Sequence, residues 1–275
     1  MGYSVLMSVY KKEKPEFLKC AIESILGQTV KTDDFVIVWD GTLTIELEVM
    51  LEDYKNKYPE IIRFLKLNKN VGLGQALQEG VKQCRHSVIA RMDSDDIAVQ
   101  QRMEWQLKAF QDEPELALCG GYIDEFASNP DLIEYKRIVP CSQEEIYEYA
   151  KKRNPMNHMT VMFRKDAVIT AGNYLPMDLA EDYYLWVRML MKGYRCRNLS
   201  QVLVKARVGN GMLQRRGGWR YAMAMKHLMF TFYQIGFLSL LQCLTNISIR
   251  MVISLLPGTM RKNFYVKKLR KGEHE

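Results

Sequence analysis

The chain has 275 residues, of which 48% are hydrophobic and 26% charged, with 39 Lys and Arg against 32 Asp and Glu. This composition can bury one large core or two small ones, and it excludes intrinsic disorder, collagen and coiled coils. The six cysteines lie far apart, without a C-x-x-C pair or a zinc-type Cys/His cluster, which favours a reduced cytosolic compartment. The first lysines follow the first apolar run, so no cleaved signal peptide is expected.

The first hundred residues alternate β-rich and helical patterns. Strands are predicted to begin near Ser4, Phe35, Ile61 and Ser87, and amphipathic helices are predicted between them over 16–26, 45–58 and 74–84. Strands that alternate with helices at this spacing are typical of right-handed βαβ crossovers. The sequence therefore predicts a doubly wound α/β fold with a mostly parallel sheet.

The elements after residue 96 follow no regular period. Helices are predicted over 98–111, 143–152 and 182–192, and extended segments over 117–126, 133–139, 158–164 and 201–207. Because the chain shows no repeat and no low-complexity linker, we expect one α/β domain over 1–210, followed by a C-terminal helical region over 211–275.

The charge is distributed unevenly along the chain. Residues 1–204 carry a net charge of −4, whereas 205–275 carry +11 and include an uncharged stretch over 228–249. Basic residues flank that stretch on both sides, which conflicts with the orientation rule for a single membrane span. We expect basic amphipathic helices that lie on the anionic cytoplasmic leaflet, so that the protein is peripheral on the inner face of the cell membrane. The alternative is a buried helix with a solvated basic tail; no nucleic-acid motif accompanies the charge.

The ends of the first two predicted strands carry polar groups. In an open α/β sheet, ligands bind beyond the carboxyl ends of the strands. The first strand ends in Ser8, Val9 and Tyr10, which offer a hydroxyl, a free backbone edge and a ring for a flat base. The second ends in Asp40, whose carboxylate can accept a hydrogen bond from a ring N–H. A turn role explains Asp40 equally well.

Three carboxylates follow the fourth strand, at Asp93, Asp95 and Asp96. Their mutual repulsion is easiest to understand where Mg²⁺ or Mn²⁺ neutralises it, since these ions take one or two protein carboxylates together with substrate phosphates. Asp93 and Asp95 can face the same side of an extended segment, which implies a nucleotide diphosphate as ligand. Asp96 can instead cap a helix from residue 97. The stretch 70–74 is interpreted as a plain turn, although its amides can also face an anion.

A second acidic pair, Glu181 and Asp182, precedes an aromatic helical segment. A carboxylate at a helix N-terminus is stabilised by the helix dipole, so capping is one explanation. The other is a general base that removes a proton from an attacking hydroxyl. His158, inside an apolar pattern, is interpreted as a core residue.

Taken together, these segments resemble the family 2 glycosyltransferases of the GT-A fold. The matching features are SVLMSVY, SILGQT, VIVWDG, NVGLGQAL, IARMDSDD, HMTVMFR and LAEDYYLW, which cover about residues 3–190. The downstream QRRGGWRY and the basic C-terminus resemble the capsule and exopolysaccharide branch, which includes amylovoran-type enzymes. The resemblance implies an inverting transfer from a nucleotide sugar, usually a UDP-sugar, to a hydroxyl of a lipid-linked saccharide, with Mn²⁺ or Mg²⁺ as cofactor.

The resemblance also implies a role for each candidate residue. Ser8, Val9, Tyr10 and Asp40 would bind the nucleotide, with Asp40 on the uracil edge. Asp93 and Asp95 would form the DxD element, in which Asp95 is the principal metal ligand. Asp182 would be the catalytic base and Glu181 its alternative, and Arg215 and Arg216 would contact the diphosphate.

The sequence departs from the family pattern in two places. Trp39 and Thr42 replace the first Asp and the Ser of the Asp-Asp-Gly-Ser run that many relatives carry after the second strand. The QRRGG segment does not match the Q-x-x-R-W of processive synthases, so one sugar per encounter is expected. The competing hypotheses are a nucleotidyltransferase, which would need a Gly-rich loop after the first strand, and a non-catalytic protein that binds membrane surfaces.

Overall fold

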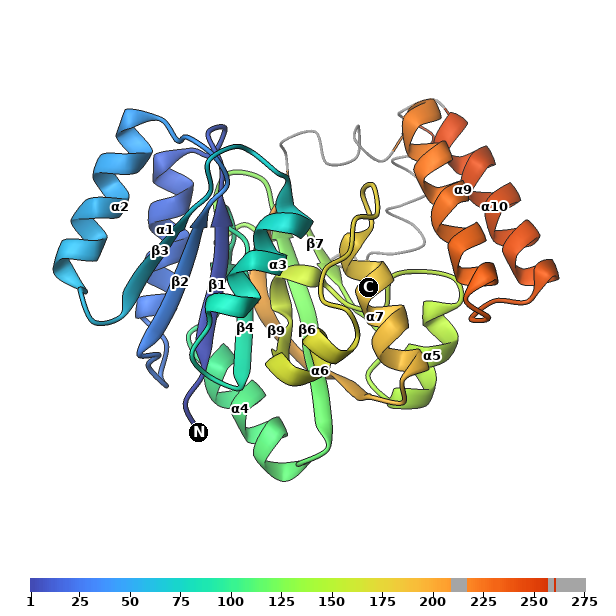
Figure 1. Cartoon of the computed structure of the whole chain (residues 1–275), viewed down its shortest axis with the longest axis horizontal. Coiled ribbons are helices and arrows are strands. Elements are labelled where there is room, and N and C mark those ends of the chain that lie inside the picture. The colour runs from blue at the N-terminus through green and yellow to red at the C-terminus, as the bar shows by residue number, and fades with distance from the viewer. Residues whose placement is uncertain (209–216, 257–259, 261–275) are drawn as a thin grey trace.

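The computed structural model describes residues 1–208, 217–256 and 260. Within these residues, nine strands form one sheet in the order β3-β2-β1-β4-β8-β6-β9-β5, with β7 paired to β6 (Figure 1). The strands are β1 Ser4–Val9, β2 Asp34–Trp39, β3 Ile62–Lys66, β4 Val88–Met92, β5 Ile97–Ala98, β6 Leu116–Phe126, β7 Tyr135–Arg137, β8 Met162–Arg164 and β9 Arg195–Arg207. The helices are α1 Pro15–Leu26, α2 Ile45–Lys57, α3 Leu73–Gln83, α4 Arg102–Asp112, α5 Gln143–Ala150, the 3-10 helix η1 His158–Thr160, α6 Lys165–Thr170, α7 Glu181–Met191, α9 Gly218–Gln234 and α10 Leu240–Leu255.

The first four strands form the parallel half of the sheet that the sequence predicts. Both faces are covered, because alternate side chains of a strand point to opposite sides. On β2, Phe35 and Ile37 belong to the core cluster that includes α1, α2 and α4, whereas Val36 and Val38 belong to the cluster that includes α3, α6, α7 and α9. The mixed α/β fold with helices on both faces is therefore confirmed.

The second half differs from the predicted pattern in detail. β8 is antiparallel to both β4 and β6, and β9 is parallel to β6. The strand predicted from residue 158 begins as a 3-10 turn, and the segment expected over 201–207 is part of the longer β9. The helix expected from residue 98 begins at Arg102, because Ile97 and Ala98 pair with β9 instead. Capping of a helix from residue 97 by Asp96 was therefore a wrong prediction.

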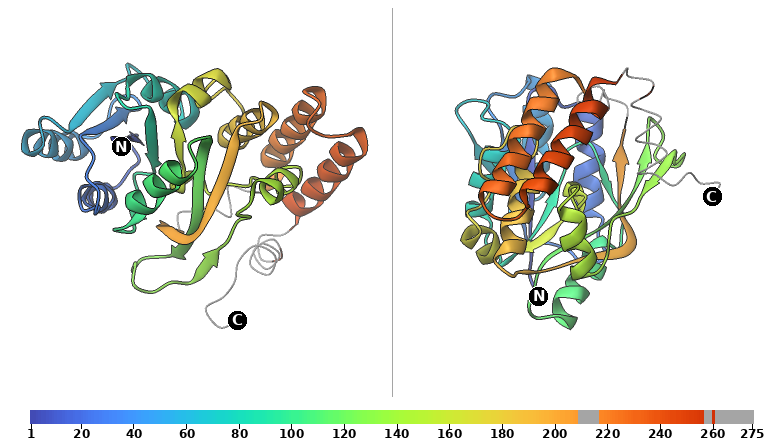
Figure 2. Two further views of the ribbon diagram at one scale, coloured as in Figure 1. Left: turned by 90° about the horizontal axis from the view of Figure 1, so that it is seen from below. Right: turned by 90° about the vertical axis from the view of Figure 1, so that its right-hand side faces the viewer.

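The uncharged stretch 228–249 forms parts of two helices that lie side by side (Figures 1 and 2). Ser239 starts the second helix: its hydroxyl accepts from the N–H of Gln242, whose side chain accepts from the N–H of Ser239, which completes a capping box. Among residues 1–208 and 217–256, no helix is long and apolar enough to cross a bilayer. The predicted boundary between 210 and 211 falls outside the described residues.

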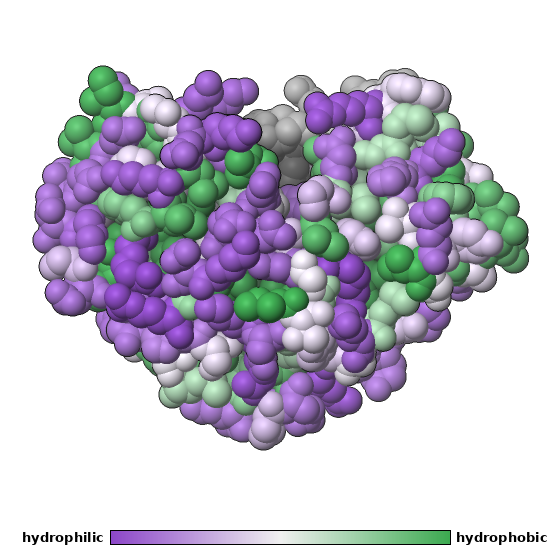
Figure 3. All heavy atoms as spheres, viewed as in Figure 1, coloured by the Kyte–Doolittle hydropathy of each residue, from purple (hydrophilic) through white to green (hydrophobic). Residues whose placement is uncertain are grey.

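The two C-terminal helices differ in how much they bury. α9 places Leu228, Met229 and Phe232 in the same apolar cluster as α3 and α7, whereas Cys243 and Ser254 are the buried residues of α10. Apolar side chains gather at the right-hand edge of the molecule, where α10 lies (Figure 3).

Candidate active site

The carboxyl ends of β2, β1 and β4 lie side by side, because these strands are neighbours in the sheet. Ser8 is half-buried and Tyr10 is exposed at this edge. The side chain of Val9 lies in the core, and its carbonyl accepts a hydrogen bond from the N–H of Asp40 at 2.8 Å. The Val9 carbonyl therefore carries one hydrogen bond, and its second lone pair can still accept one from a ligand.

Asp40 is buried and bonded to the loop before α3. Its Oδ1 accepts from the N–H of Val71 at 2.6 Å, and its Oδ2 accepts from the N–H of Gly72 at 3.0 Å and from Nδ2 of Asn70 at 2.9 Å. Gly41 allows this contact, since a Cβ there would lie 2.5 Å from the Asn70 nitrogen. The loop amides do face an anion, and that anion is the carboxylate of Asp40.

The same loop reaches the acidic pair at the start of α7. A Cβ at Gly74 would lie 2.9 Å from Cγ and 3.0 Å from Cβ of Glu181, so the absence of a side chain at Gly74 makes room for Glu181. The loop over 70–74 therefore lies between Asp40, on the predicted nucleotide side, and Glu181, on the predicted catalytic side.

Asp93 is held by a buried arginine. Both terminal nitrogens of Arg91 donate to the two carboxylate oxygens of Asp93, with Nη1 at 2.6 Å from Oδ2. This pairing raises the pKa of Arg91 against the opposing effect of its burial. The Asp93 side chain remains 27% exposed, so the fork fixes its direction without enclosing it.

Asp95 is partly buried among like charges. Burial, followed by the charges of Asp93 and Glu13, raises its pKa to about 7. Glu13 reaches this place from the loop after β1, where its carboxylate accepts a hydrogen bond from the hydroxyl of Ser94. A nearby cation would therefore stabilise the charged form of Asp95.

Asp96 points inward instead. It is buried and accepts from the N–H of Arg207 at 2.8 Å, which joins the ends of β4 and β9. Burial, with the charges of Asp93 and Asp95, raises its pKa well above the usual range.

The two acidic residues at the start of α7 have different surroundings. Asp182 accepts from Nδ2 of Asn154 at 2.7 Å and from the N–H of Tyr183 at 2.7 Å. Burial and the neighbouring charge of Asp182 raise the pKa of Glu181 to about 7.

The charge of Arg91 counters this rise in the pKa of Glu181. The arginine that holds Asp93 therefore also influences the charge of Glu181.

His158 lies beside this site and is bonded within the core. Its Nε2 is 3.0 Å from the hydroxyl of Tyr174, and its ring contacts Trp186. Burial, followed by the charge of Arg91, lowers its pKa well below the usual value, so the ring is neutral at physiological pH.

Asp95 fits a divalent ion bound together with a nucleotide diphosphate. Such an ion needs one or two protein carboxylates, because phosphates and water complete its shell. Asp95, with Asp93 beside it, supplies that number. In the part of the chain that the structure describes, no three His, Cys, Asp or Glu side chains form a complete metal cage. Arg215 and Arg216, predicted to contact the diphosphate, lie outside the described residues.

Three residues of this site were missed by the sequence interpretation: Arg91, Glu13 and Asn154. Arg91 carries a signal, because a charged residue inside the apolar run SVIARM must find a partner when it is buried. Glu13 and Asn154 lie in loops, where no periodicity marks their direction.

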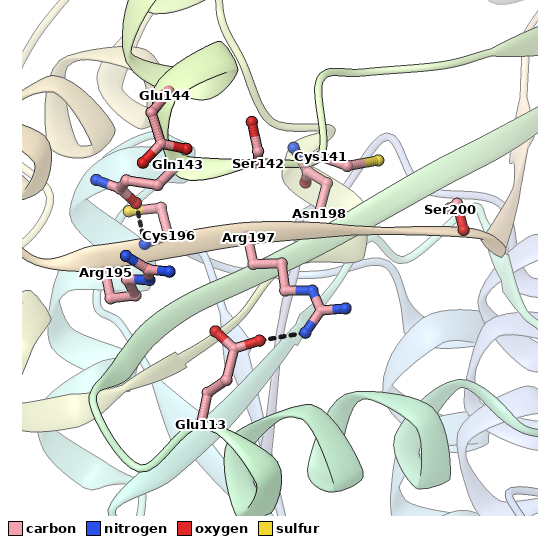
Figure 4. A pocket seen from close by; sticks show the side chains of 10 residues that line it. All are labelled: Glu113, Cys141, Ser142, Gln143, Glu144, Arg195, Cys196, Arg197, Asn198 and Ser200. Atoms are coloured by element: carbon pink, nitrogen blue, oxygen red, sulfur yellow. Dashed lines mark hydrogen bonds and ion pairs between the residues drawn. The ribbon is translucent and has the colours of Figure 1, made fainter.

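A separate cavity of about 300 Å³ lies between the start of α5 and the start of β9 (Figure 4). Arg195, Arg197 and Gln143 line it, and Arg197 is paired with Glu113. None of the predicted site residues lines this cavity.

The parallel α/β half-sheet, with acidic residues at the end of β4 and at the start of α7, is typical of the glycosyltransferases of the GT-A fold. Residues 4–170 match the family described as Glycosyl transferase family 2. The chain belongs to this family and is a glycosyltransferase, not a nucleotidyltransferase.

Relatives of this chain include bacterial glycosyltransferases. It is 43% identical to an uncharacterized glycosyltransferase of Haemophilus influenzae (98% of this chain, 100% of the relative). It is 40% identical to the amylovoran biosynthesis glycosyltransferase AmsE of Erwinia amylovora (86% and 88%). It is 36% identical to the UDP-Gal:alpha-D-GlcNAc-diphosphoundecaprenol beta-1,3-galactosyltransferase of Escherichia coli (98% and 97%).

Solved structures share the fold. TarS of S. aureus superposes with a TM-score of 0.63 at 20% identity, over 98% of this chain and 46% of TarS. The mannosyltransferase PcManGT from Pyrobaculum calidifontis, in complex with GDP-Man and Mn²⁺, gives a TM-score of 0.63 at 13% identity, over 96% and 79% of the two chains. The predicted GT-A fold is thereby confirmed.

Proposed function

We propose that this chain is an inverting, metal-dependent enzyme that transfers one sugar from a UDP-sugar to a hydroxyl of a lipid-linked saccharide, in the synthesis of a bacterial capsule, exopolysaccharide or O-antigen. The observation that carries this proposal is the similarity to the Escherichia coli galactosyltransferase over nearly the whole of both chains. The acidic groups described above support it, because each has a place in such a reaction.

The donor binds at the ends of β1, β2 and β4. Ser8, Val9 and Tyr10 contact the nucleotide, and Asp40 shapes its uracil edge through the loop that it holds. Asp95 and Asp93 hold Mn²⁺ or Mg²⁺ at the diphosphate, and Arg215 and Arg216 contribute positive charge there. When bound, such an ion stabilises the negative charge that the leaving UDP acquires.

The acceptor hydroxyl is activated at the start of α7. Asp182 takes the proton of this hydroxyl while the hydroxyl oxygen bonds to the anomeric carbon. The bond from that carbon to the UDP oxygen breaks on the opposite face. A single displacement inverts the anomeric configuration. Glu181 is the alternative base, since a carboxyl group with a pKa near 7 also suits proton transfer.

Substitutions at the two acidic groups separate donor binding from chemistry. We expect Asp95→Asn to weaken Mn²⁺-dependent UDP binding at least about tenfold, because it removes a charged metal ligand. We expect Asp182→Asn to keep UDP binding and to lower turnover about 100- to 10,000-fold, because it removes a general base. Calorimetry with UDP and Mn²⁺ measures the first effect, and UDP release in the presence of acceptor measures the second.

Asp112→Asn is a matched control, since Asp112 is an exposed carboxylate at the end of α4 that pairs only with Lys108 among the described contacts. It should change neither quantity. Wild-type turnover in both Asp182→Asn and Glu181→Gln would reject the acidic pair as the base. Unchanged metal-dependent UDP binding in Asp95→Asn would reject the metal assignment.

A further inference from the structure

The outward face of α10 is apolar although it is exposed. Leu241, Leu244, Ile249, Val252 and Leu255 all point to solvent, with exposed fractions of 75% for Leu241 and 63% for Val252. The opposite face of the helix is covered by the rest of the protein through Cys243, Ile247 and Ser254. Five large apolar side chains exposed on one side of a helix are unusual at a water-exposed surface and indicate that something covers them.

The neighbouring helix α9 also exposes aromatic and basic side chains. Trp219, Phe230 and Tyr233 are exposed on α9, together with Lys226. Trp and Tyr side chains are typical of the level of lipid headgroups, because their rings are apolar and their N–H or O–H groups are polar. Figure 2 (right) looks directly at this helix pair.

The charged side chains of the two helices are all basic, and one of them, Arg220, pairs with Asp178 of the neighbouring loop. Residues 217–256 contain Arg220, Lys226 and Arg250 and no Asp or Glu. By sequence, six further Lys and Arg residues follow between 261 and 271, and Glu273 and Glu275 are the first acidic residues after them. An apolar face on helices that carry basic and no acidic residues fits an anionic bilayer, in which an apolar layer lies below negatively charged headgroups.

We propose that the outward face of α9 and α10 docks flat on an anionic lipid bilayer. The leucine, isoleucine and valine side chains of α10 would enter the acyl boundary, and the basic and aromatic side chains would contact the headgroups. A protein partner is a weaker match, since a protein surface complementary to this patch would itself have to be apolar, exposed and acidic at its rim. In this proposal both helix axes lie parallel to the membrane plane.

The surface is connected to the catalytic groups through the core. The ring of Phe232 on α9 lies 5.0 Å from the ring of Tyr183, which directly follows Asp182 on α7. In one respect this inference rests on the proposed function: a lipid-linked acceptor would place the reacting hydroxyl close to the same bilayer. The docking itself is argued from α9 and α10 alone.

Vesicle binding tests the surface without any activity readout. The probe is vesicles of equal parts phosphatidylcholine and phosphatidylglycerol, compared with vesicles of phosphatidylcholine alone. We expect the wild-type chain to cosediment with the anionic vesicles and to be released by salt. We expect Leu241→Glu combined with Val252→Glu to bind at least about tenfold more weakly, because two charged groups would have to enter the apolar boundary.

Ile45→Glu combined with Val49→Glu is the matched control. Ile45 and Val49 are equally exposed apolar residues, at 77% and 57%, on α2 at the other end of the molecule. This variant should bind vesicles like the wild type, and both variants should keep the wild-type melting temperature, since all four side chains are exposed.

Three outcomes would overturn the proposal. They are failure of the wild-type chain to bind anionic vesicles, equal binding by the α10 double variant, and a wild-type dimer in sedimentation that the α10 variant dissociates. The last outcome would assign the face to a second copy of this chain. UDP binding in the same samples is a separate measurement. Failure to bind vesicles would not contradict the proposed reaction, and failure to bind UDP would not contradict membrane docking.

Discussion

At the scale of single residues, the carboxylate of Asp182 is oriented by a neighbouring amide. Nδ2 of Asn154 donates to Oδ2 of Asp182 at 2.7 Å, while Oδ1 of Asn154 accepts from the N–H of Met156 at 3.2 Å. The second bond fixes which end of the amide faces Asp182, because only the NH₂ end can donate. Asn154 is therefore a positioning residue for the proposed base.

We expect Asn154→Ala to lower turnover about tenfold with little change in the donor KM. A hydrogen bond to a charged group is worth about 1.5–3 kcal/mol, and its loss makes the ionised carboxylate less stable. The acid limb of the pH–rate profile should therefore move to higher pH by about one unit. Asn246→Ala, which removes a side-chain bond to the Lys151 carbonyl, is the control. An unmoved acid limb would show that Asn154 has only a structural role.

At the scale of elements, the loop before α3 joins two parts of the site. It donates to Asp40 through Val71 and Gly72, and Gly74, in the first turn of α3, lies against Glu181. Glu181 is consequently enclosed between the start of α3 and the start of α7. This enclosure removes water from its carboxylate and raises its pKa, which links its protonation to stability.

The stability of the chain should therefore depend on pH through Glu181. A carboxyl group whose pKa rises on folding, here to about 7, stabilises the folded state at low pH, and this contribution is lost as pH rises through 7. Between pH 6 and pH 8 the wild type should lose about 1 kcal/mol, or about 3 °C in Tm, more than Glu181→Gln. Thermal unfolding of both proteins at the two pH values measures the difference. Parallel pH curves would contradict the enclosed carboxyl group.

The sequence predicts correctly those strands and helices whose position follows from a local pattern of apolar residues. The strands β1 to β4 follow from their apolar runs, and Asp40 and Asp93 follow from the rule that ligands bind at strand ends. Residues 97 and 98 were assigned to a helix because pairing with β9, more than a hundred residues away, leaves no local pattern. Glu13 was missed for the same reason, since its contact with Ser94 spans 81 positions.

At the scale of the whole molecule, α9 is part of the core that supports α7. Leu228, Met229 and Phe232 of α9 are fully buried, and the ring of Phe232 meets Tyr183 edge to face. The division into 1–210 and 211–275 stays a prediction, but this packing favours one cooperative unit. Deleting the chain from about residue 222 would therefore expose core residues. Substitutions on the exposed face of the helices test membrane docking better than such a deletion, because they leave the core intact.

Phe232→Ala and Phe230→Ala distinguish one unit from two. Phe232 is buried against α7, whereas Phe230, two residues before it, is 47% exposed. Removing a buried phenylalanine costs about 3–5 kcal/mol, so Phe232→Ala should lower the Tm of the whole chain by about 10 °C, while Phe230→Ala should leave it nearly unchanged. Because α9 and the sheet share a core, the unfolding temperature measured by circular dichroism and that of the transition stabilised by UDP should fall by the same amount. If Phe232→Ala instead produced an early unfolding transition while the transition stabilised by UDP kept its wild-type temperature, the C-terminal helices would unfold on their own.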